Sequence, residues 1–358
     1  MIETLLDRYG DGTVLAAAGA LVGLVFGAGA QHSRFCLRAA AVEVAQGLLG
    51  PRLAIWLIAF NAGVLCVQSL VVAGWFDPSA SRQLAATGSL SGAIIGGLMF
   101  GCGMILARGC ASRLLVLSAT GNLRALITGL VLTIVAQMSL RGALSPLRET
   151  LAGIWTVEGG AGRDLLVLLH LTPAIAAILA GLALIISLWL GQRHRLRTSH
   201  MVAALCVGGA IGLGWALTYA VAQNSFGVVP LSSVTFTGPS ADTLMGLVNS
   251  RALPLSFGIG LVPGVFAGAA LMALATGEAR IERFGVDTPM ERYLIGAVLM
   301  GFGSMLAGGC AVGAGMSGGS VFALTAWVAV TCMWAGAMIT QRAIGSAGSS
   351  APVTPPVA

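Results

Sequence analysis

Long apolar runs, separated by short polar segments, dominate the sequence. Such runs lie at about residues 14–30, 53–75, 90–107, 123–140, 165–190, 201–222, 253–275, 292–308 and 321–340. Because about 20 apolar residues are needed to cross roughly 30 Å of hydrocarbon, each run is a candidate membrane-spanning helix. The pattern predicts an all-α polytopic membrane protein with about nine transmembrane helices.

The composition supports this class and excludes others. Of the 358 residues, 57% are hydrophobic and only 9% are charged, with a mean hydropathy of +0.92. A soluble domain carries about 25% charged residues, so an ordinary soluble enzyme, a disordered protein and a nucleic-acid binder are excluded. The net charge of +6 is typical of a membrane protein whose cytoplasmic loops are rich in basic residues.

The basic residues also predict an orientation. The densest basic cluster, residues 192–197, joins the fifth and sixth runs, and we place it in the cytoplasm. The N-terminus is then expected outside and the C-terminus inside. The rule is followed incompletely, because five arginines fall outside: Arg82, Arg141, Arg148, Arg163 and Arg251.

An internal repeat with an offset of 200 residues is the strongest sequence signal. Residues 96–111 and 296–311 are identical at eight of sixteen positions. The copies lie in the third and eighth runs, an odd number of spans apart, and should therefore cross the membrane in opposite directions. We expect one transporter domain over residues 1–342, with inverted halves at 1–141 and 201–342, a linker at 142–200 and a disordered tail at 343–358. Inverted repeats are typical of secondary transporters.

Both copies are followed by a piece too short to span. Gly109-Cys110 precedes a run that ends at Gly121, and Gly309-Cys310 precedes a glycine-rich stretch. A third short piece follows Cys36. Non-helical backbone at membrane depth is tolerated only where it is buried in protein or lines a cavity. These pieces are predicted to be re-entrant half-helices with one thiol at each turn.

The expected chemistry at these turns is recognition of a soft anion. A neutral thiol is a weak S–H donor with a polarizable sulfur, and glycines such as Gly109 and Gly309 allow a ligand to approach the backbone. Four arginines are candidates for attracting the anion, or they merely reflect the positive-inside rule: Arg34, Arg38, Arg108 and Arg113. The hydroxyl-rich segment 232–242 is either the lining of an outer vestibule or a solvated turn. No catalytic residue, metal site or cofactor is predicted.

Cysteine spacing argues against a disulfide framework. The chain has seven cysteines and no C-x-x-C motif, so a structural disulfide network is not indicated. Cys66, Cys206 and Cys332 are interpreted as packing residues, and the role of Cys102 is left open.

The motifs around the three cysteines resemble those of the YeeE/YedE family of sulfur-compound transporters. The resemblance rests on Phe35-Cys36, on residues 106–113 with 121–124, and on residues 306–313 with 315–318, and it extends over nearly the whole chain. It implies a bacterial inner-membrane importer of thiosulfate, or of a selenium compound, with an hourglass-like fold and a central constriction. It also implies that Cys36, Cys110 and Cys310 pass the ion along by S–H···S hydrogen bonds. A separate cytosolic TusA-like (YeeD-type) protein is an implied partner.

The sequence therefore predicts uptake of a small sulfur-containing anion, with thiosulfate first. A selenium compound or another sulfur species is the alternative within the same class. Three alternatives come from other classes: a soft-metal transporter, a membrane thiol oxidoreductase, which needs a close cysteine pair, and a scaffold without flux.

Overall fold

The computed structural model describes residues 2–251, 253–283 and 290–349, and it is almost entirely helical. The described residues include nine helical segments long and apolar enough to cross a membrane, as predicted. Their long helices are α2 (Asp11–His32), α4 (Pro51–Val72), α6 (Leu90–Leu106), α8 (Leu123–Arg141), α11 (Pro173–Arg193), α12 (Thr198–Asn224), α14 (Phe257–Ala275), α15 (Met290–Leu306) and α16 (Leu324–Ser349).

Short elements fill the connections between these helices. They are α1 (Ile2–Tyr9), α3 (Leu37–Ala45), η1 (Pro78–Ala80), α5 (Arg82–Ala85), β1 (Gly88–Ser89), α7 (Ala111–Ala119), α9 (Ser145–Gly153), β2 (Thr156–Val157), η2 (Ala161–Arg163), α10 (Leu165–Leu168), α13 (Thr237–Asn249) and η3 (Ala311–Gly318). Strands β1 and β2 pair antiparallel, with Gly88 opposite Val157. Helices α3, α7 and η3 are the short pieces that the sequence predicted after the three cysteines.

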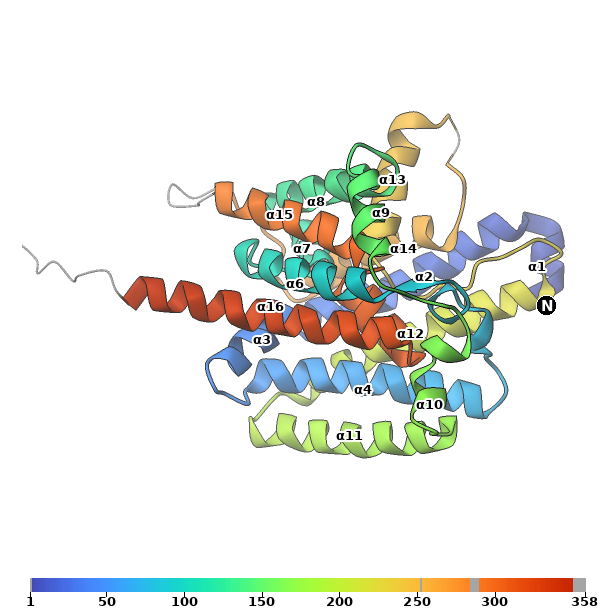
Figure 1. Cartoon of the computed structure of the whole chain (residues 1–358), viewed down its shortest axis with the longest axis horizontal. Coiled ribbons are helices and arrows are strands. Elements are labelled where there is room, and N and C mark those ends of the chain that lie inside the picture. Colours follow the sequence, from blue (N-terminus) through green and yellow to red (C-terminus); the bar gives the residue numbers. More distant parts are fainter. Residues whose placement is uncertain (1, 252, 284–289, 350–358) are drawn as a thin grey trace, which may run out of the picture.

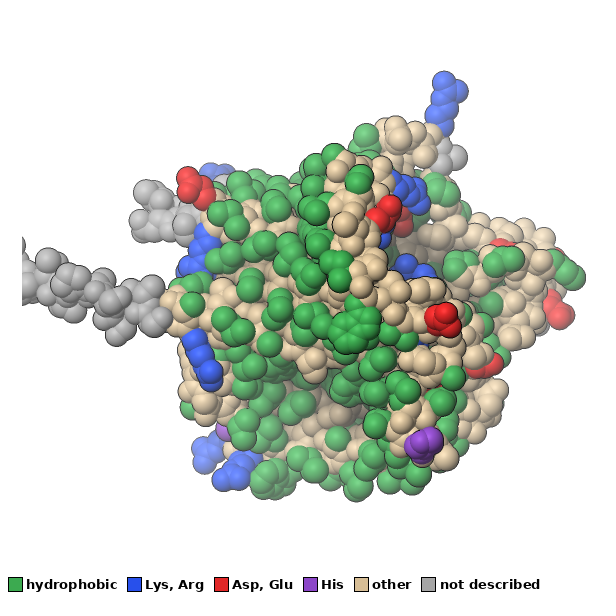
Figure 2. Space-filling view, viewed as in Figure 1, with side chains coloured by type: hydrophobic (Ala, Val, Ile, Leu, Met, Phe, Trp, Pro, Cys, Tyr) green, Lys and Arg blue, Asp and Glu red, His purple; other side chains and the backbone are tan. Residues whose placement is uncertain are grey.

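The long helices lie side by side in Figure 1, and α11 lies at one edge next to α4. The side chains of Ile178 and Ile185 on α11 are 63% and 64% exposed, as expected of a helix that faces lipid. Hydrophobic side chains cover the middle of the face shown in Figure 2, and charged side chains lie mainly toward its two ends. This distribution is that of a multi-pass membrane protein.

Glycines of the repeat hold α6 against α15. A Cβ atom on Gly96 would lie 2.5 Å from the carbonyl oxygen of Gly303, and one on Gly103 would lie 2.6 Å from that of Gly296. Close backbone contact through small residues is a common way of packing membrane helices. Because the earlier glycine of each helix faces the later glycine of the other, the two helices are antiparallel. The turns after α6 and α15 therefore lie at opposite ends of this helix pair.

Two predicted boundaries differ from the structure. The fifth run was expected from residue 165, but α11 begins at Pro173, where Thr172 accepts a hydrogen bond from the backbone of Ile175. The chain turns just before this point because His170 has φ 53°. At the other boundary, α16 extends through Ser349, into the segment predicted as a tail, and residues 350–358 lie outside the described residues.

Candidate functional site

Each of the three predicted cysteines occupies the N-cap position of a short helix. Cys36 precedes α3, Cys110 precedes α7 and Cys310 precedes η3. Two residues before each cysteine the backbone is left-handed, with φ 55° at Arg34, 53° at Arg108 and 81° at Gly308. This conformation ends the preceding helix and turns the chain. The same local geometry thus occurs three times, each time with a thiol at the turn.

Cys36 and Cys110 lie together. Their side chains are within hydrogen-bonding reach of each other, and the residues are 8% and 1% exposed. The sulfur of Cys110 also lies 3.3 Å from the hydroxyl of Ser112. Arg113, one turn into α7, is close enough to interact electrostatically with both cysteines. The structure therefore brings together two cysteines that are far apart in the sequence.

Cys310 lies on a different turn. It is 1% exposed, and its sulfur accepts a hydrogen bond from the backbone N–H of Gly313 at 3.4 Å. A Cβ atom on Gly313 would collide with the side chain of Thr235, and the hydroxyl of Ser317 donates to the carbonyl of Val234 at 2.6 Å. The segment that leads into α13 therefore packs directly on η3.

Three phenylalanine rings connect the two sets of turns. Phe26 lies 6.3 Å from Phe35 and 5.1 Å from Phe236, measured between ring centroids. The three residues are at most 2% exposed. Phe35 directly precedes Cys36, and Phe236 follows the segment that contacts η3. We call these three rings the phenylalanine cluster; it links the residue before Cys36 to the segment that packs on η3.

A polar cluster lies next to the Cys36–Cys110 pair, and we call it the Glu278 latch. Glu278 accepts hydrogen bonds from Gln31 at 2.8 Å and from Arg34 at 3.0 Å, and Arg113 reaches Gln31 at 3.5 Å. The Arg34 guanidinium lowers the pKa of the Glu278 carboxyl, mainly by donating this hydrogen bond. The latch joins the end of α2, the start of α7 and the segment after α14. Sequence analysis missed Glu278 because nothing in its local sequence marks it.

The predicted arginines have different surroundings. Arg34 belongs to the latch, whereas Arg38 is partly buried next to Cys36 and Arg108. Within the described part of the chain, the Nε of Arg38 has no hydrogen-bond partner. Arg108 is exposed. The predicted glycines also differ, since a Cβ atom on Gly309 would lie 2.7 Å from the backbone nitrogen of Ala314, whereas one on Gly109 would meet only Leu114 and Arg113 side-chain atoms, at 3.3 Å or more.

The turn of Cys310 opens into a cavity of about 410 Å³, which we call the arginine cavity. Its wall includes three arginines, several hydroxyl side chains and the glycines that precede Cys310: Arg82, Arg141, Arg148, Ser232, Ser233, Thr235, Gly308 and Gly309. Asp242 also lines it. Of the two interpretations of segment 232–242, the structure therefore favours a cavity lining.

A second cavity of about 270 Å³ shares Arg82, Arg148 and Gly308 with the first. Arg163 lines it and is only 6% exposed. One of its terminal nitrogens donates to the hydroxyl of Thr325 at 2.7 Å. Burial lowers the pKa of the Arg163 guanidinium, with a smaller effect of the charge on Arg82.

Sequence analysis did not identify these arginines as site residues. Arg82, Arg141, Arg148 and Arg163 appeared only as exceptions to the positive-inside rule. Their departure from the positive-inside rule was the signal that could have marked them, because an arginine that the rule does not explain is a candidate for a functional role.

Comparison with known proteins gives a consistent assignment. The family model described as sulphur transport matches residues 32–339. The thiosulfate transporter TsuA of Escherichia coli (strain K12) is 26% identical over 340 residues, covering 88% of this chain and 89% of that protein. The thiosulfate transporter TsuA of Spirochaeta thermophila is 28% identical over 332 residues, covering 87% of this chain and 93% of that protein.

The matched region contains all three predicted cysteines and most of the spanning helices. Its description names transport rather than catalysis, in agreement with the expectation of a transporter and not an enzyme. The chain belongs to the sulphur transport family, identified in the sequence as YeeE/YedE.

Proposed function

We propose that this protein imports thiosulfate across the bacterial inner membrane, with its N-terminus outside and its C-terminus inside. The observation that carries the proposal is the repeated turn with a buried cysteine at the start of a short helix, occurring on both sides of the phenylalanine cluster. The names of the two relatives support thiosulfate as the ion.

The arginine cavity is the proposed entrance. Arg82, Arg141 and Arg148 line it, and positive charge around a concave site raises the local concentration of an anion. The cavity ends at the glycines before Cys310, where the first backbone N–H groups of η3 lack helical partners. Such groups bind anions, so a dianion that enters here meets donors from both the side chains and the backbone.

The proposed selective step is passage through the waist, by which we mean the constriction formed by the phenylalanine cluster and the turns of the three cysteines. The thiol of Cys310 donates an S–H hydrogen bond to the terminal sulfur of thiosulfate, and Cys110 and Cys36 receive the ion on the other side of the phenylalanine cluster. Sulfate has no terminal sulfur, and it is more strongly hydrated than the softer thiosulfate ion. A site that matches polar partners to one ion rejects another by leaving those partners unmatched.

The Glu278 latch is the proposed exit. Arg34 and Arg113 neutralise Glu278 while the path is closed, and they are attractive partners for an anion that leaves the Cys36–Cys110 pair. A TusA-like cytosolic protein is the proposed acceptor on that side.

Two inverted halves are proposed as the underlying architecture. The antiparallel contact of Gly96 with Gly303 and of Gly103 with Gly296 supports it, because exchanging the two halves exchanges these two contacts. Two other pairs of contacts are related in the same way: α3 packs on α16 as α13 packs on α8, and α7 packs on α8 as η3 packs on α16.

The test is uptake of radiolabelled thiosulfate into proteoliposomes, with sulfate, sulfite and selenite as competitors. We expect uptake that excess unlabelled thiosulfate suppresses and sulfate does not. In the double variant Arg82→Gln/Arg148→Gln, the thiosulfate concentration that gives half-maximal uptake should rise. In the matched control Arg251→Gln, it should stay unchanged. Uptake indistinguishable from empty liposomes, in protein shown to be inserted, would contradict the proposal, and stronger suppression by selenite would favour the selenium alternative.

One observation bears on the oxidoreductase alternative. That function needs a close cysteine pair, and Cys36 and Cys110 form one. The family assignment nevertheless favours transport, and all seven cysteines are free thiols in the structure.

A further inference from the structure

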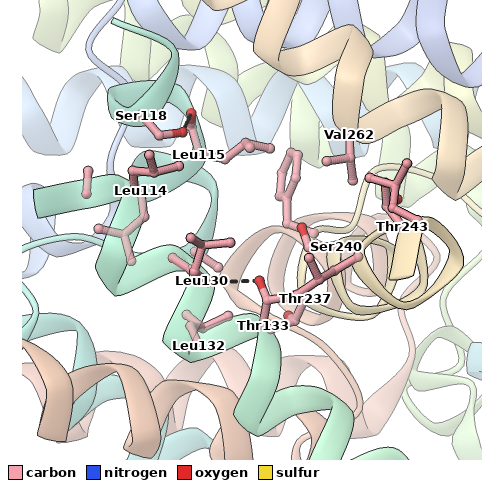
Figure 3. A pocket seen from close by; sticks show the side chains of 17 residues that line it. Leu114, Leu115, Ser118, Leu130, Leu132, Thr133, Thr237, Ser240, Thr243 and Val262 are labelled. Carbon is pink, nitrogen blue, oxygen red and sulfur yellow. Dashed lines mark hydrogen bonds between the residues drawn. The ribbon is translucent and has the colours of Figure 1, made fainter. Parts of the chain in front are cut away.

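A cavity at the lipid-facing side of the bundle lies beside the proposed ion path. It has a volume of about 180 Å³ and lies where α7, α8, α13 and α14 meet. Figure 3 shows side chains of α7 and α8 on one side of it and side chains of α13 and α14 on the other, arranged around a common space.

The mouth of this cavity is apolar and exposed. Leu126, Leu130 and Leu247 line it and are 40%, 43% and 66% exposed. Leu126 and Leu130 belong to α8, which is one of the candidate spanning helices. The floor, in contrast, is formed by Ala111 and Phe236, which are 7% and 1% exposed. The cavity therefore extends from the hydrocarbon-facing surface to the residue after Cys110.

Three of the five hydroxyl groups of the wall bond to carbonyls of their own helices, whereas that of Thr237 is buried without a hydrogen-bond partner among the described residues. Ser118 donates to the carbonyl of Leu115 at 2.6 Å, Thr133 to that of Gly129 at 2.8 Å, and Thr243 to that of Pro239 at 2.7 Å. Three hydroxyls are thus satisfied within their own helices, and the wall presents mainly carbon to an occupant.

We propose that an acyl chain of a membrane phospholipid occupies this cavity. Apolar cavities of roughly 150 Å³ stay free of water and bind benzene-sized apolar ligands, so about 180 Å³ accommodates a segment of an alkyl chain. The surrounding bilayer supplies alkyl chains at the mouth, and filling the space restores dispersion contacts that an empty cavity lacks.

An occupant here acts on the turn of Cys110. Ala111 directly follows that cysteine, and Phe236 contacts Phe26 in the phenylalanine cluster. The acyl chain therefore supports α7 against α13 from the lipid side. The binding itself does not depend on which ion the protein transports.

The test uses full-length protein reconstituted with phosphatidylglycerol that carries a photoreactive diazirine in its acyl chain. After illumination, mapped peptides should show labelling concentrated in residues 126–133 and 237–247, above the labelling of the lipid-facing residues 178–186 of α11. Equal labelling of these regions would indicate only annular lipid and would overturn the proposal.

Gly129→Phe is the variant that fills the cavity. A Cβ atom there would meet only Leu114, at 3.9 Å, so the ring is free to enter the space. Gly209→Phe is the matched control, because a Cβ at this glycine of α12 has nothing within 4 Å and the position does not line the cavity. We expect labelling of residues 126–133 and 237–247 to fall at least tenfold in Gly129→Phe and to stay unchanged in Gly209→Phe.

Ser240→Leu, on the opposite wall, gives the same comparison if Gly129→Phe fails to insert. Unchanged labelling in the inserted filling variant would overturn the proposal. So would labelling of the same peptides by a diazirine-bearing free fatty acid but not by the phospholipid. Neither readout measures transport, so failure of this proposal and failure of the proposed function are distinguishable.

Discussion

At the scale of single residues, the three cysteines stand where helix capping favours other side chains. Ser, Thr, Asp and Asn are the usual N-cap residues because a side-chain oxygen accepts from the first backbone N–H groups. The side chains of Cys36 and Cys110 make no capping hydrogen bond, and Cys310 makes one long bond to Gly313. Capping alone therefore does not explain thiols at these positions, and the proposed recognition of a soft ion gives them a role.

Proximity of Cys36 and Cys110 leads to a prediction about oxidation. A mild thiol oxidant such as diamide should remove one proton and one electron from each thiol and join the two sulfurs, and the resulting disulfide should block uptake. A reductant should restore it. The check is uptake measured before oxidation, after oxidation and after reduction, together with mass spectrometry of the linked peptides.

Cys332→Ser is the control for this experiment, because Cys332 lies on α16 away from the pair and should leave the oxidant's effect intact. Cys36→Ser should remove the effect. Persistent inhibition in Cys36→Ser would show that another thiol is responsible.

At the scale of elements, the short helices and the phenylalanine cluster together form the proposed waist of the ion path. Phe236 replaces a cysteine at the residue before α13, the position that Cys36 holds before α3 at the 200-residue offset. Four turns, those before α3, α7, α13 and η3, are thus related by the repeat. The turn before α13 contributes a ring, and the other three contribute a thiol.

Phe236→Ala should weaken selectivity. Removing the ring opens space at the waist, so that sulfate can pass with more of its hydration water and without contact with the thiols, and the ratio of sulfate to thiosulfate uptake should rise severalfold. Competition uptake assays measure this ratio. Phe266→Ala, on the lipid-facing side of α14, is the control and should leave the ratio unchanged. An unaltered ratio in Phe236→Ala would mean that the cluster does not limit passage.

The Glu278 latch has a predictable pH dependence. Because Arg34 holds the pKa of Glu278 below the ordinary carboxyl value, the contact stabilises the folded protein above that value and is lost as the pH falls through the lowered pKa. Arg34 and Glu278 are 52% and 38% exposed, so the contribution is that of a screened surface pair. Glu278→Gln should lower the melting temperature at pH 7 by about 1–3 °C.

The difference between wild type and Glu278→Gln should begin to shrink as the pH falls below the ordinary glutamate pKa of about 4.3 and should vanish once the pH is below the lowered pKa of Glu278. Thermal unfolding in detergent across this range measures it. Glu291→Gln, at the start of α15, should show no such pH-dependent difference. A gap that persists at low pH would assign the effect of Glu278→Gln to something other than the carboxylate charge.

At the scale of the whole molecule, the sequence predicted the helical class and the turns because both depend on local patterns. The long apolar runs predicted the number of spanning helices, and the repeat of residues 96–111 at 296–311 predicted opposite directions for the two helices but not their contact. The start of α11 was missed because the apolar run from Leu165 continues through His170, and only the left-handed backbone there separates the two helices.

The rest of the site depends on contacts between distant segments. Arg82, Arg141 and Arg148 come from three different loops and helix ends, and no local pattern places them around one cavity. Glu278 meets Gln31 and Arg34 only because α2 and α14 pack along their length. Phe26, Phe35 and Phe236 look like ordinary core residues until the fold brings their rings together.

The most direct test of the central claim is uptake of radiolabelled thiosulfate by Cys110→Ala and Cys310→Ala in proteoliposomes, with insertion verified for each. Alanine removes the S–H donor, and the fold should be retained because the side chain of Cys110 makes no capping bond and that of Cys310 makes one long bond. If thiols recognise the ion on both sides of the waist, uptake by each variant should fall roughly 10- to 150-fold, the effect of removing one hydrogen bond to a charged partner. Uptake close to wild type in both variants would contradict the account.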